Sequence, residues 1–469
     1  MKKLIIFSFL LSFVACKDLV DFTEVENPNL SETSVVGQLN SSTIWLTGIE
    51  RQFSILMNEA VINAEIASDN YKNNQTFFNQ FLDGLAITAQ DDDVADLQFA
   101  LHRLREMAVF GKDQVGPNDA NYTAETEAEY NFFEGMAYLY AGMYFTGLPA
   151  TAGGPALSDV DNLTQANALF DAAIGINSKP EYLLAKARTQ YLLGNKAEAV
   201  SAATKALTDG GNNFLRSARF DESEGPSNTM EDGLYERGTF DDLQPLPTLD
   251  FLDPKYSFNT ANEDDPIYYL KAEEAILIRI EAAIADGDLP GAKTLMGDLL
   301  TVVSGRLVKP IDDSIEGRTQ QAPGSRPDTS CVVVNGRAGL VLDRDQGDVN
   351  IPKISGTSLT QAGIDAIANA DEALEVLYRT RQEIFIAEGM RMVDMGVKLV
   401  ISETEVLQNE NITAGSRGTV AQIPSFIDAV KGQLDAFTYT PGSCTATTAV
   451  DVNKILVANK TAPEVLPFH

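Results

Sequence analysis

The stretch EYLLAKARTQYLLGNKAEAVSAATKAL, residues 181–207, decides the architecture of this chain. Small residues recur along it, with Ala187 before the turn LLGNK, Gly194 inside that turn, and Ala199 and Ala206 after it. Small side chains on facing surfaces allow two helices to pack at a short interaxial distance. The stretch therefore predicts two antiparallel helices joined by a short turn.

A second stretch repeats this pattern, EEAILIRIEAAIADGDLPGAKTLMGDLL at residues 273–300. Gly287 precedes Ala292 by five positions, the same interval that separates Gly194 from Ala199. A glycine in the turn and small residues at fixed offsets are typical of tetratricopeptide units. Two copies at one spacing indicate a repeat more strongly than one copy does.

Two further helix pairs are looser. Residues 129–145 and 163–174 flank a Gly- and Pro-rich turn, and residues 34–67 and 92–110 also carry apolar residues at helical spacing. Stacked repeats need at least three units to bury a continuous core, and about four pairs meet this condition. We expect a mainly α fold, a scaffold of tetratricopeptide-like helix pairs in a single globular unit. A generic helical bundle is the alternative, because Ala-rich helices imitate the repeat.

Long irregular regions separate the predicted helices. They are rich in Gly, Pro, Ser and acidic residues, with only short strand-like runs such as CVVVNG. Loops this long in a compact protein are usually functional or disordered, and on a rigid helical scaffold we expect them to form the binding face. The predicted unit at 34–469 has helix pairs within 34–213 and 263–302, loop-rich binding regions at 214–262 and 303–370, and a C-terminal helix and tail at 371–469.

The N-terminal segment carries the chain's longest apolar run, at residues 4–15. It is shorter than the roughly 20 residues that a helix needs to cross a bilayer, but it suits a secretory signal. The sequence FVAC at 13–16 resembles a bacterial lipobox, in which cleavage before the cysteine leaves that cysteine to carry lipid. We therefore expect a lipoprotein signal peptide at 1–15 and a tether at 16–33 with lipidation at Cys16. An ordinary signal with a chance cysteine is the alternative.

The net charge limits which partners the protein can bind, and the cysteine content bears on its disulfide state. The chain has 35 Lys plus Arg against 67 Asp plus Glu, a formal net charge of −32. Such a surface repels nucleic acid, so we expect no nucleic-acid partner. The remaining cysteines, Cys331 and Cys444, form an even pair that an oxidising compartment would allow to cross-link. Two free, buried thiols are equally compatible with the sequence.

Three stretches carry a recognisable pattern: FFEGMAYLYAGMYFTGLPA at 132–150, DPIYYLKAEEAILIRIEAAIADGD at 265–288, and YRTRQEIFIAEGMRMVDMG at 378–396. Together they resemble the SusD/RagB family of Bacteroidetes, outer-membrane lipoproteins that capture nutrients for a TonB-dependent transporter. Lys271 and Thr380 stand where the family usually has Arg and Glu. The resemblance implies a SusD-like fold, a lipid-anchored position on the cell surface at the outer membrane, a SusC-like transporter as partner, and an oligosaccharide or polysaccharide ligand.

The third stretch also has a physical interpretation of its own. Glu388, Arg391 and Asp394 lie three residues apart, which on a helix predicts a ladder of opposite charges along one side. An acid–base dyad would use the same residue types. We interpret the ladder as structural, because no nucleophile or shifted pKa is indicated beside it.

Histidine is too scarce for most hydrolytic machinery. With only His102 and His469, a histidine-based triad or a multi-histidine metal site is not expected. The acidic runs at 91–93 and 263–265 lack EF-hand spacing, and we interpret them as solvated charge. We therefore expect no enzyme, cofactor or metal. A carboxylate-based glycoside hydrolase remains a third hypothesis, because such chemistry needs only two acids.

Aromatic rings and amides are what a glycan site needs, since rings stack on sugar faces and amides bind hydroxyls. In the family, the loop after the first long helix commonly lends an aromatic to the ligand, and the matching segment here is 68–81. A peptide-binding, RagB-type function is the second hypothesis, and each aromatic could instead pack under its own loop. The candidate ligand-binding residues are Tyr71, Asn73, Asn74, Gln75, Phe77 and Phe78 in this segment, with Tyr235 and Arg237 in a second loop.

Overall fold

A computed structural model gives the fold of the chain. Among its described helices, none has both the length and the apolarity that a bilayer crossing requires. The predicted signal peptide and tether, including Cys16, lie outside the described residues. The structure describes residues 35–73, 79–236, 243–255, 264–312, 326–343 and 348–469.

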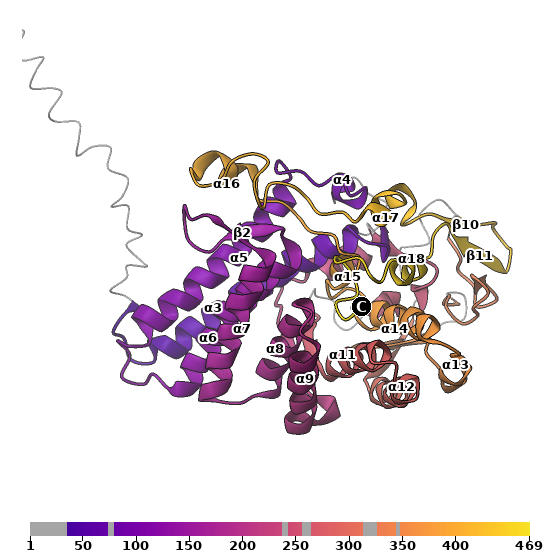
Figure 1. The fold of residues 1–469 in the computed structure, drawn as a ribbon, viewed down its shortest axis with the longest axis horizontal. Coiled ribbons are helices and arrows are strands. Elements are labelled where there is room, and N and C mark those ends of the chain that lie inside the picture. The colour runs from indigo at the N-terminus through magenta and orange to yellow at the C-terminus, as the bar shows by residue number, and fades with distance from the viewer. Residues whose placement is uncertain (1–34, 74–78, 237–242, 256–263, 313–325, 344–347) are drawn as a thin grey trace, which may run out of the picture.

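The described residues contain four helix pairs that follow one another along the chain (Figure 1). Helix α5 of the first pair contacts α6, α7 contacts α8, and α9 contacts α11, so the pairs stack into one continuous core. This confirms the predicted mainly α, tetratricopeptide-like fold. The pairs are α3 (Ser41–Ile66) with α5 (Asp92–Phe110), α6 (Ala124–Tyr144) with α7 (Asp159–Ile176), α8 (Pro180–Leu192) with α9 (Lys196–Gly210), and α11 (Ala272–Ala285) with α12 (Leu289–Ser304).

The two clearest repeats owe their shape to the small residues that predicted them. Ala199 and Ala292 are completely buried between helices. Gly194 and Gly287 have φ values of 73° and 76°, a left-handed conformation that closes each turn and that residues with a Cβ adopt at a cost. Spacing and backbone conformation therefore agree in both copies.

A further group of helices covers the last repeat. Helix α14 (Ala370–Ile384) packs against α11, and α18 (Val452–Ala458) packs against α14. The shorter helices are α4 (Gln80–Asp83), α10 (Thr229–Glu231), α13 (Gln361–Ala366), α15 (Arg391–Asp394), α16 (Glu403–Gln408) and α17 (Ser425–Asp428), with single turns at η2 (Gly111–Val115), η3 (Gly211–Asn213), η4 (Asp232–Glu236), η5 (Asp250–Lys255) and η8 (Lys431–Gln433).

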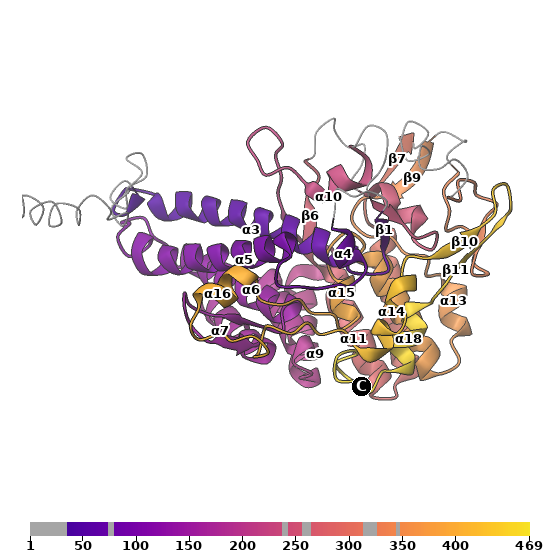
Figure 2. The same cartoon turned by 90° about the horizontal axis from the view of Figure 1, so that it is seen from above.

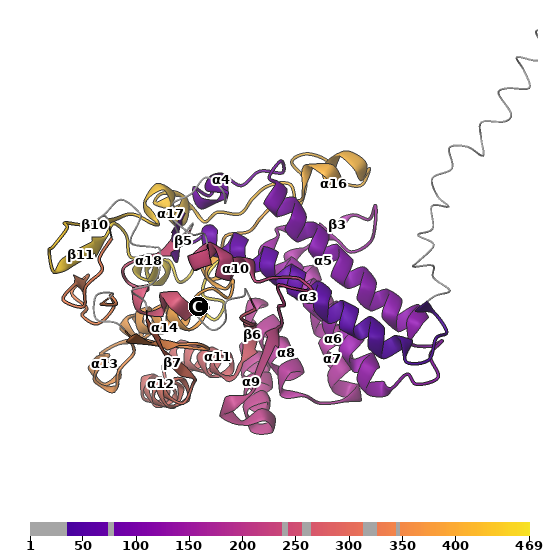
Figure 3. The ribbon, with the colours of Figure 1, turned by 180° about the vertical axis from the view of Figure 1, so that it is seen from behind.

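Short strands form several small sheets (Figure 2). In the three-stranded sheet the order is β10, β11, β8, and β11 runs parallel to β8. Figures 1 and 3 show β10, β11, α14 and α18 at the end of the molecule opposite the first residues of α3. The pairs are β1 (Tyr71–Asn73) with β5 (Leu243–Pro245), β2 (Gly147–Pro149) with β3 (Ala156–Ser158), β4 (Leu215–Ala218) with β6 (Ile267–Lys271), β7 (Val308–Asp312) with β9 (Asp348–Pro352), and β10 (Phe437–Tyr439) with β11 (Thr445–Thr448), beside β8 (Val333–Val334).

The charged ladder predicted in the third motif does not form. Helix α14 ends at Ile384, and Gly389 has a left-handed φ of 80° that turns the chain before α15 begins. Glu388 therefore lies in the turn, while Arg391 and Asp394 lie on a separate short helix. The prediction failed because the three-residue spacing was assumed to fall on one continuous helix.

Each of these three charges is instead buried against its own partner. The exposed fractions are 4% for Glu388, 1% for Arg391 and 7% for Asp394. A buried charge is tolerated when an opposite charge and hydrogen bonds compensate its lost hydration. The ion pairs therefore join segments that lie far apart in the sequence: Glu388 with Lys255 and Lys271, Arg391 with Asp69, and Asp394 with Arg381.

Candidate functional site

A polar cleft of 190 Å³ lies where both predicted loop-rich regions meet α14 and the segment after α3. The first region contributes Leu246 and Thr248, the second contributes Asn335 and Arg337, and α14 contributes Arg379. Of two larger cavities, the one of 410 Å³ is lined by described residues of neither region, and the one of 580 Å³ by described residues of the first region only. The polar cleft is therefore the cavity that best matches the predicted binding face.

The floor of the polar cleft is a hydrogen-bonded network. Arg391 donates to both carboxylate oxygens of Asp69, at 2.5 and 2.9 Å, and also to Oδ1 of Asn453 at 2.9 Å. Asn453 donates to Gln382, and Gln382 donates to Oδ1 of Asn70, each at 3.0 Å. These bonds join the segment after α3 to α14, α15 and α18. A network this buried holds the floor in one arrangement before any ligand arrives.

One wall of the cleft is a tight hairpin turn. Asn335 and Gly336 have φ values of 52° and 80°, and Val334 and Arg337 exchange two backbone hydrogen bonds of 2.8 Å. An Asn-Gly pair with positive φ at both positions is the preferred two-residue hairpin loop. The Asn335 amide donates to Thr448 Oγ1 at 2.8 Å and its Oδ1 accepts from the Thr448 N–H at 3.1 Å.

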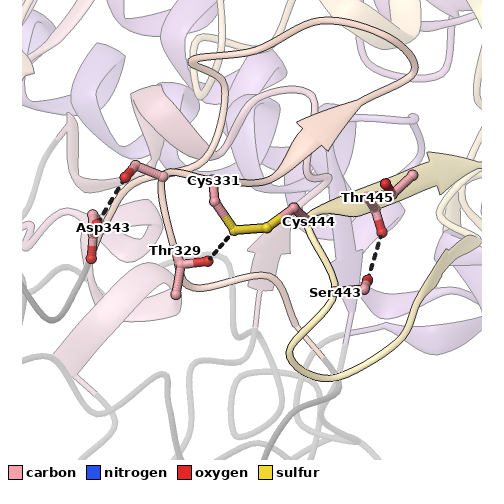
Figure 4. The surroundings of a disulfide bond; sticks show 7 residues. Thr329, Cys331, Asp343, Ser443, Cys444 and Thr445 are labelled. Carbon is pink, nitrogen blue, oxygen red and sulfur yellow. Dashed lines mark hydrogen bonds between the residues drawn. A yellow bond between two sulfur atoms is a disulfide. The ribbon is translucent and has the colours of Figure 1, made fainter.

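A disulfide cross-links the segments that form the same wall of the cleft. Cys331 is bonded to Cys444, so of the two states that the sequence left open the structure has the cross-linked one (Figure 4). The bond joins the segment just before β8 to the residue just before β11, and a small separate core includes residues of both strands. That core consists of Val332, Val334, Leu340, Val341 and Ala446.

Two arginines line the cleft, and they differ in their hydrogen bonds. Arg337 donates to Glu383 Oε1 at 3.2 Å and to the Ser358 hydroxyl. Arg379 has Glu375 as its nearest carboxylate, at 4.0 Å, and within the described chain its guanidinium makes no hydrogen bond. Burial, and secondly the Arg337 cation, lower the pKa of Arg379 from its ordinary value. Within the described chain, the guanidinium of Arg337 therefore has hydrogen-bond acceptors, whereas that of Arg379 has only a long ion pair.

The structure corrects the expectation for the first of the sequence-predicted ligand residues. Tyr71 is 1% exposed and Asn73 is 8% exposed, because both point inward from β1 while Lys72 points outward. The sequence was interpreted as a loop here, whereas β1 pairs with β5 and sends alternate side chains to the core. The prediction that Tyr71 is an exposed ring is therefore wrong.

The other predicted residues remain predictions. Asn74, Gln75, Phe77, Phe78 and Arg237 lie outside the described residues, and Tyr235 belongs to η4. The two segments that carry them are nevertheless attached at neighbouring points, because Asn73 pairs with Leu243 across the β1–β5 sheet. The other end of the same sheet leads directly into the polar cleft, through Leu246.

Sequence reasoning missed the residues that line the polar cleft. The Asn335-Gly336 dipeptide beside a strand-like run was a recognisable hairpin signal, and it would have placed Arg337 at a strand end. Arg379 had no such signal, because it lies inside the motif that resembles the family, among residues that turned out to be buried. Among the described residues, no group of three or more His, Cys, Asp or Glu side chains is placed to hold a metal ion.

Comparison with known proteins adds to this geometry. No protein-family model and no curated protein matches the sequence. Solved structures do match: a SusD-like carbohydrate-binding protein from Bacteroides vulgatus has a TM-score of 0.52 at 12% identity, over 76% of this chain and 82% of that one. A SusD superfamily protein from Bacteroides fragilis has a TM-score of 0.52 at 13% identity, over 81% and 99%. One from Bacteroides thetaiotaomicron has 0.52 at 12%, over 80% and 98%.

The stacked helix pairs, capped by α14 and small sheets, define a helical-repeat scaffold of the tetratricopeptide type. Within that class the chain has the SusD-like fold. This confirms the fold that the three sequence stretches implied.

Proposed function

We propose that this protein is a lipid-anchored, cell-surface glycan-binding protein that captures oligosaccharide or polysaccharide and delivers it to a TonB-dependent outer-membrane transporter. The observation that carries the proposal is the polar cleft, at the junction of both loop-rich regions on a SusD-like scaffold. Lipidation of Cys16 would hold the body at the membrane, since each buried methylene contributes about 0.8 kcal/mol. Catalysis is not part of the proposal.

The chemistry of the cleft supports a sugar as ligand. Its lining is rich in amides, hydroxyls and charged groups, among them Asn335, Gln382, Thr448 and Asn453. Such groups hold hydroxyls in fixed directions, and a rigid, hydrogen-bonded floor reduces the entropy lost on binding. The aromatic surface that a pyranose ring needs is expected from Phe77 and Phe78, in the segment that follows β1.

The first experiment is affinity electrophoresis of the full chain in mild detergent, with neutral and acidic polysaccharides and a peptide digest. Calorimetry then gives Kd for any glycan retained. The variants are Phe77→Ala, Phe78→Ala and Asn335→Gly, the last of which removes an amide but keeps a residue suited to positive φ. The matched control is Phe99→Ala, because Phe99 on α5 is 66% exposed and lies outside the cleft lining.

We expect one polysaccharide to be retained, with at least a tenfold loss of affinity in one site variant and none in the control. Retention of peptides alone would replace the proposal with the RagB-type function. Release of reducing sugar by the purified chain would replace it with a glycoside hydrolase.

A further inference from the structure

Arg379 lines the polar cleft, and its guanidinium makes no hydrogen bond within the described chain. Its side chain is 26% exposed, and the nearest carboxylate, Glu375, lies at 4.0 Å. No described residue accepts a hydrogen bond from its guanidinium. An arginine offers five N–H donors in a planar fork, and a half-buried fork without acceptors has lost part of its hydration without replacement. The donors are therefore available to a ligand in the cleft.

The acids around Arg379 make their closest contacts with other groups. Asp69 is held by Arg391 at 2.5 Å, and Asp451 by Lys454 at 3.2 Å. Glu383 accepts from the Thr357 hydroxyl at 2.7 Å and the Ser358 N–H at 2.8 Å, in addition to its pair with Arg337. Each of these carboxylates already has its own partner at close range.

Glu375 forms only a long ion pair with Arg379. It lies 4.0 Å from Arg379 and 3.9 Å from Lys454, distances at which neither cation makes a hydrogen bond to it. The second guanidinium at the cleft, that of Arg337, repels Arg379 and lowers its pKa in addition to the effect of burial. An anion bound to Arg379 within the cleft would offset this repulsion.

We propose that the glycan bound in the polar cleft carries a carboxylate, as uronic or sialic acid units do, and that Arg379 binds this group with Arg337 beside it. This inference rests on the proposed function and specifies its ligand class. A planar carboxylate matches the guanidinium fork through two parallel hydrogen bonds, which adds specificity as well as energy. The net charge of −32 opposes polyanions at long range, where salt screens it, whereas a carboxylate and the Arg379 guanidinium would interact at contact distance.

The test compares protein and ligand changes together. The full chain is run in affinity gels containing polygalacturonate, alginate, hyaluronan or a sialylated mucin, each beside its carboxyl-reduced form. Pullulan, dextran sulfate and a peptide digest complete the set. The variants are Arg379→Gln, which removes the charge and the fork, and Arg379→Lys, which keeps the charge alone. The control is Arg103→Gln, which removes one exposed charge on α5.

We expect at least one carboxylated glycan to be retained, with affinity at least tenfold weaker after carboxyl reduction. Arg379→Gln should weaken the carboxylated form by a similar factor and leave the reduced form unchanged, because the variant and the reduced ligand delete the same interaction. Arg379→Lys should recover only part of the affinity, and Arg103→Gln should bind as the unchanged protein does. A circular-dichroism melt for each variant confirms that it is folded.

The contrary results separate the inference from the function that underlies it. Retention of pullulan alone, or equal affinity for carboxylated and reduced glycans, overturns the carboxylate and leaves glycan capture standing. Retention of dextran sulfate alone, lost in Arg379→Gln, overturns it in favour of a sulfate ester. Retention of peptides alone, or of nothing, overturns both.

Discussion

At the scale of single residues, the fold depends on buried charges that have assigned partners. Arg188 on α8 donates from Nε and Nη2 to the two carboxylate oxygens of Glu274 on α11, at 2.6 and 2.7 Å. The two side chains are 2% and 1% exposed. Breaking a buried pair from one side leaves the other charge uncompensated, which is far more costly than losing an exposed pair. This pair therefore ties two repeats together.

The change Glu274→Ala tests this pair. We expect it to lower the free energy of unfolding by about 3–5 kcal/mol, because it leaves Arg188 buried without a counter-charge. The matched control is Asp209→Ala, which breaks an exposed pair with Lys205 on α9 and should cost less than about 1 kcal/mol. Urea titration followed by circular dichroism measures both. Equal losses in the two variants would contradict the role of burial.

Glu65 predicts a pH dependence at the same scale. It is fully buried, and burial raises its pKa to about 7, although hydrogen bonds from Asn70 and Gly389 act in the opposite direction. An acid with a raised folded pKa contributes stability that is complete below the unfolded value of 4.5 and is lost as pH rises through 7. The folded protein holds a proton in this window that the unfolded chain has released.

We therefore expect Glu65→Gln to remove part of the loss of stability between pH 5 and pH 8. From pH 5 to pH 8, the unfolding free energy of the unchanged protein should fall by about 2–3 kcal/mol relative to that of the variant. Urea titrations of both proteins at the two pH values give the comparison. A difference independent of pH would mean that Glu65 does not titrate in this range.

At the scale of elements, the sequence predicted the helix pairs well and the strands poorly. The four pairs depend on local signals, namely helical spacing and a glycine in each clear turn, and their bounds in the structure lie close to the predicted ones. Strand β1 has only three residues, and its partner β5 lies far along the chain, so no local sequence pattern predicted β1. Without a predicted strand, the burial of the Tyr71 side chain could not be predicted either.

The turn glycines allow a matched comparison. Gly287 has a φ of 76°, and a Cβ at this position would have no atom within 4 Å, so Gly287→Ala tests backbone conformation without a steric clash. We expect it to lower stability by about 1 kcal/mol or more. Gly175, exposed on α7, also has free space but an ordinary φ, so Gly175→Ala should stabilise by up to about 1 kcal/mol. Thermal melts that shift in the same direction for both would contradict this account.

At the scale of the whole molecule, the fold was predictable while the site was only partly so. The repeats and the three motif stretches implied the architecture. The polar cleft, in contrast, combines residues from segments near 69, 246, 335, 379 and 451, and their meeting depends on long-range packing that one sequence does not reveal. Residues of both loop-rich regions line the polar cleft, but the individual lining residues were not predicted, and the assignment of these regions as the binding face stays a prediction.

Net charge is also a property of the whole molecule, and it predicts a salt effect. With −32 charges the surface repels itself, and added ions screen that repulsion. We expect Tm to rise as NaCl increases from about 20 to about 300 mM, where the Debye length falls below ~10 Å. The cost of Glu274→Ala should stay constant over the same range, because buried pairs are screened much less. A fall in Tm with salt would contradict the prediction.

The buried ion pairs also have a consequence for descent. A single substitution at Asp69 or Arg391 leaves its partner as an uncompensated charge in the core. Evolution can therefore replace such a pair only through two coordinated substitutions. Exposed positions away from such pairs carry no such constraint. Substitutions at Asp69 and Arg391 should therefore accumulate more slowly than substitutions at exposed positions that make no buried contact.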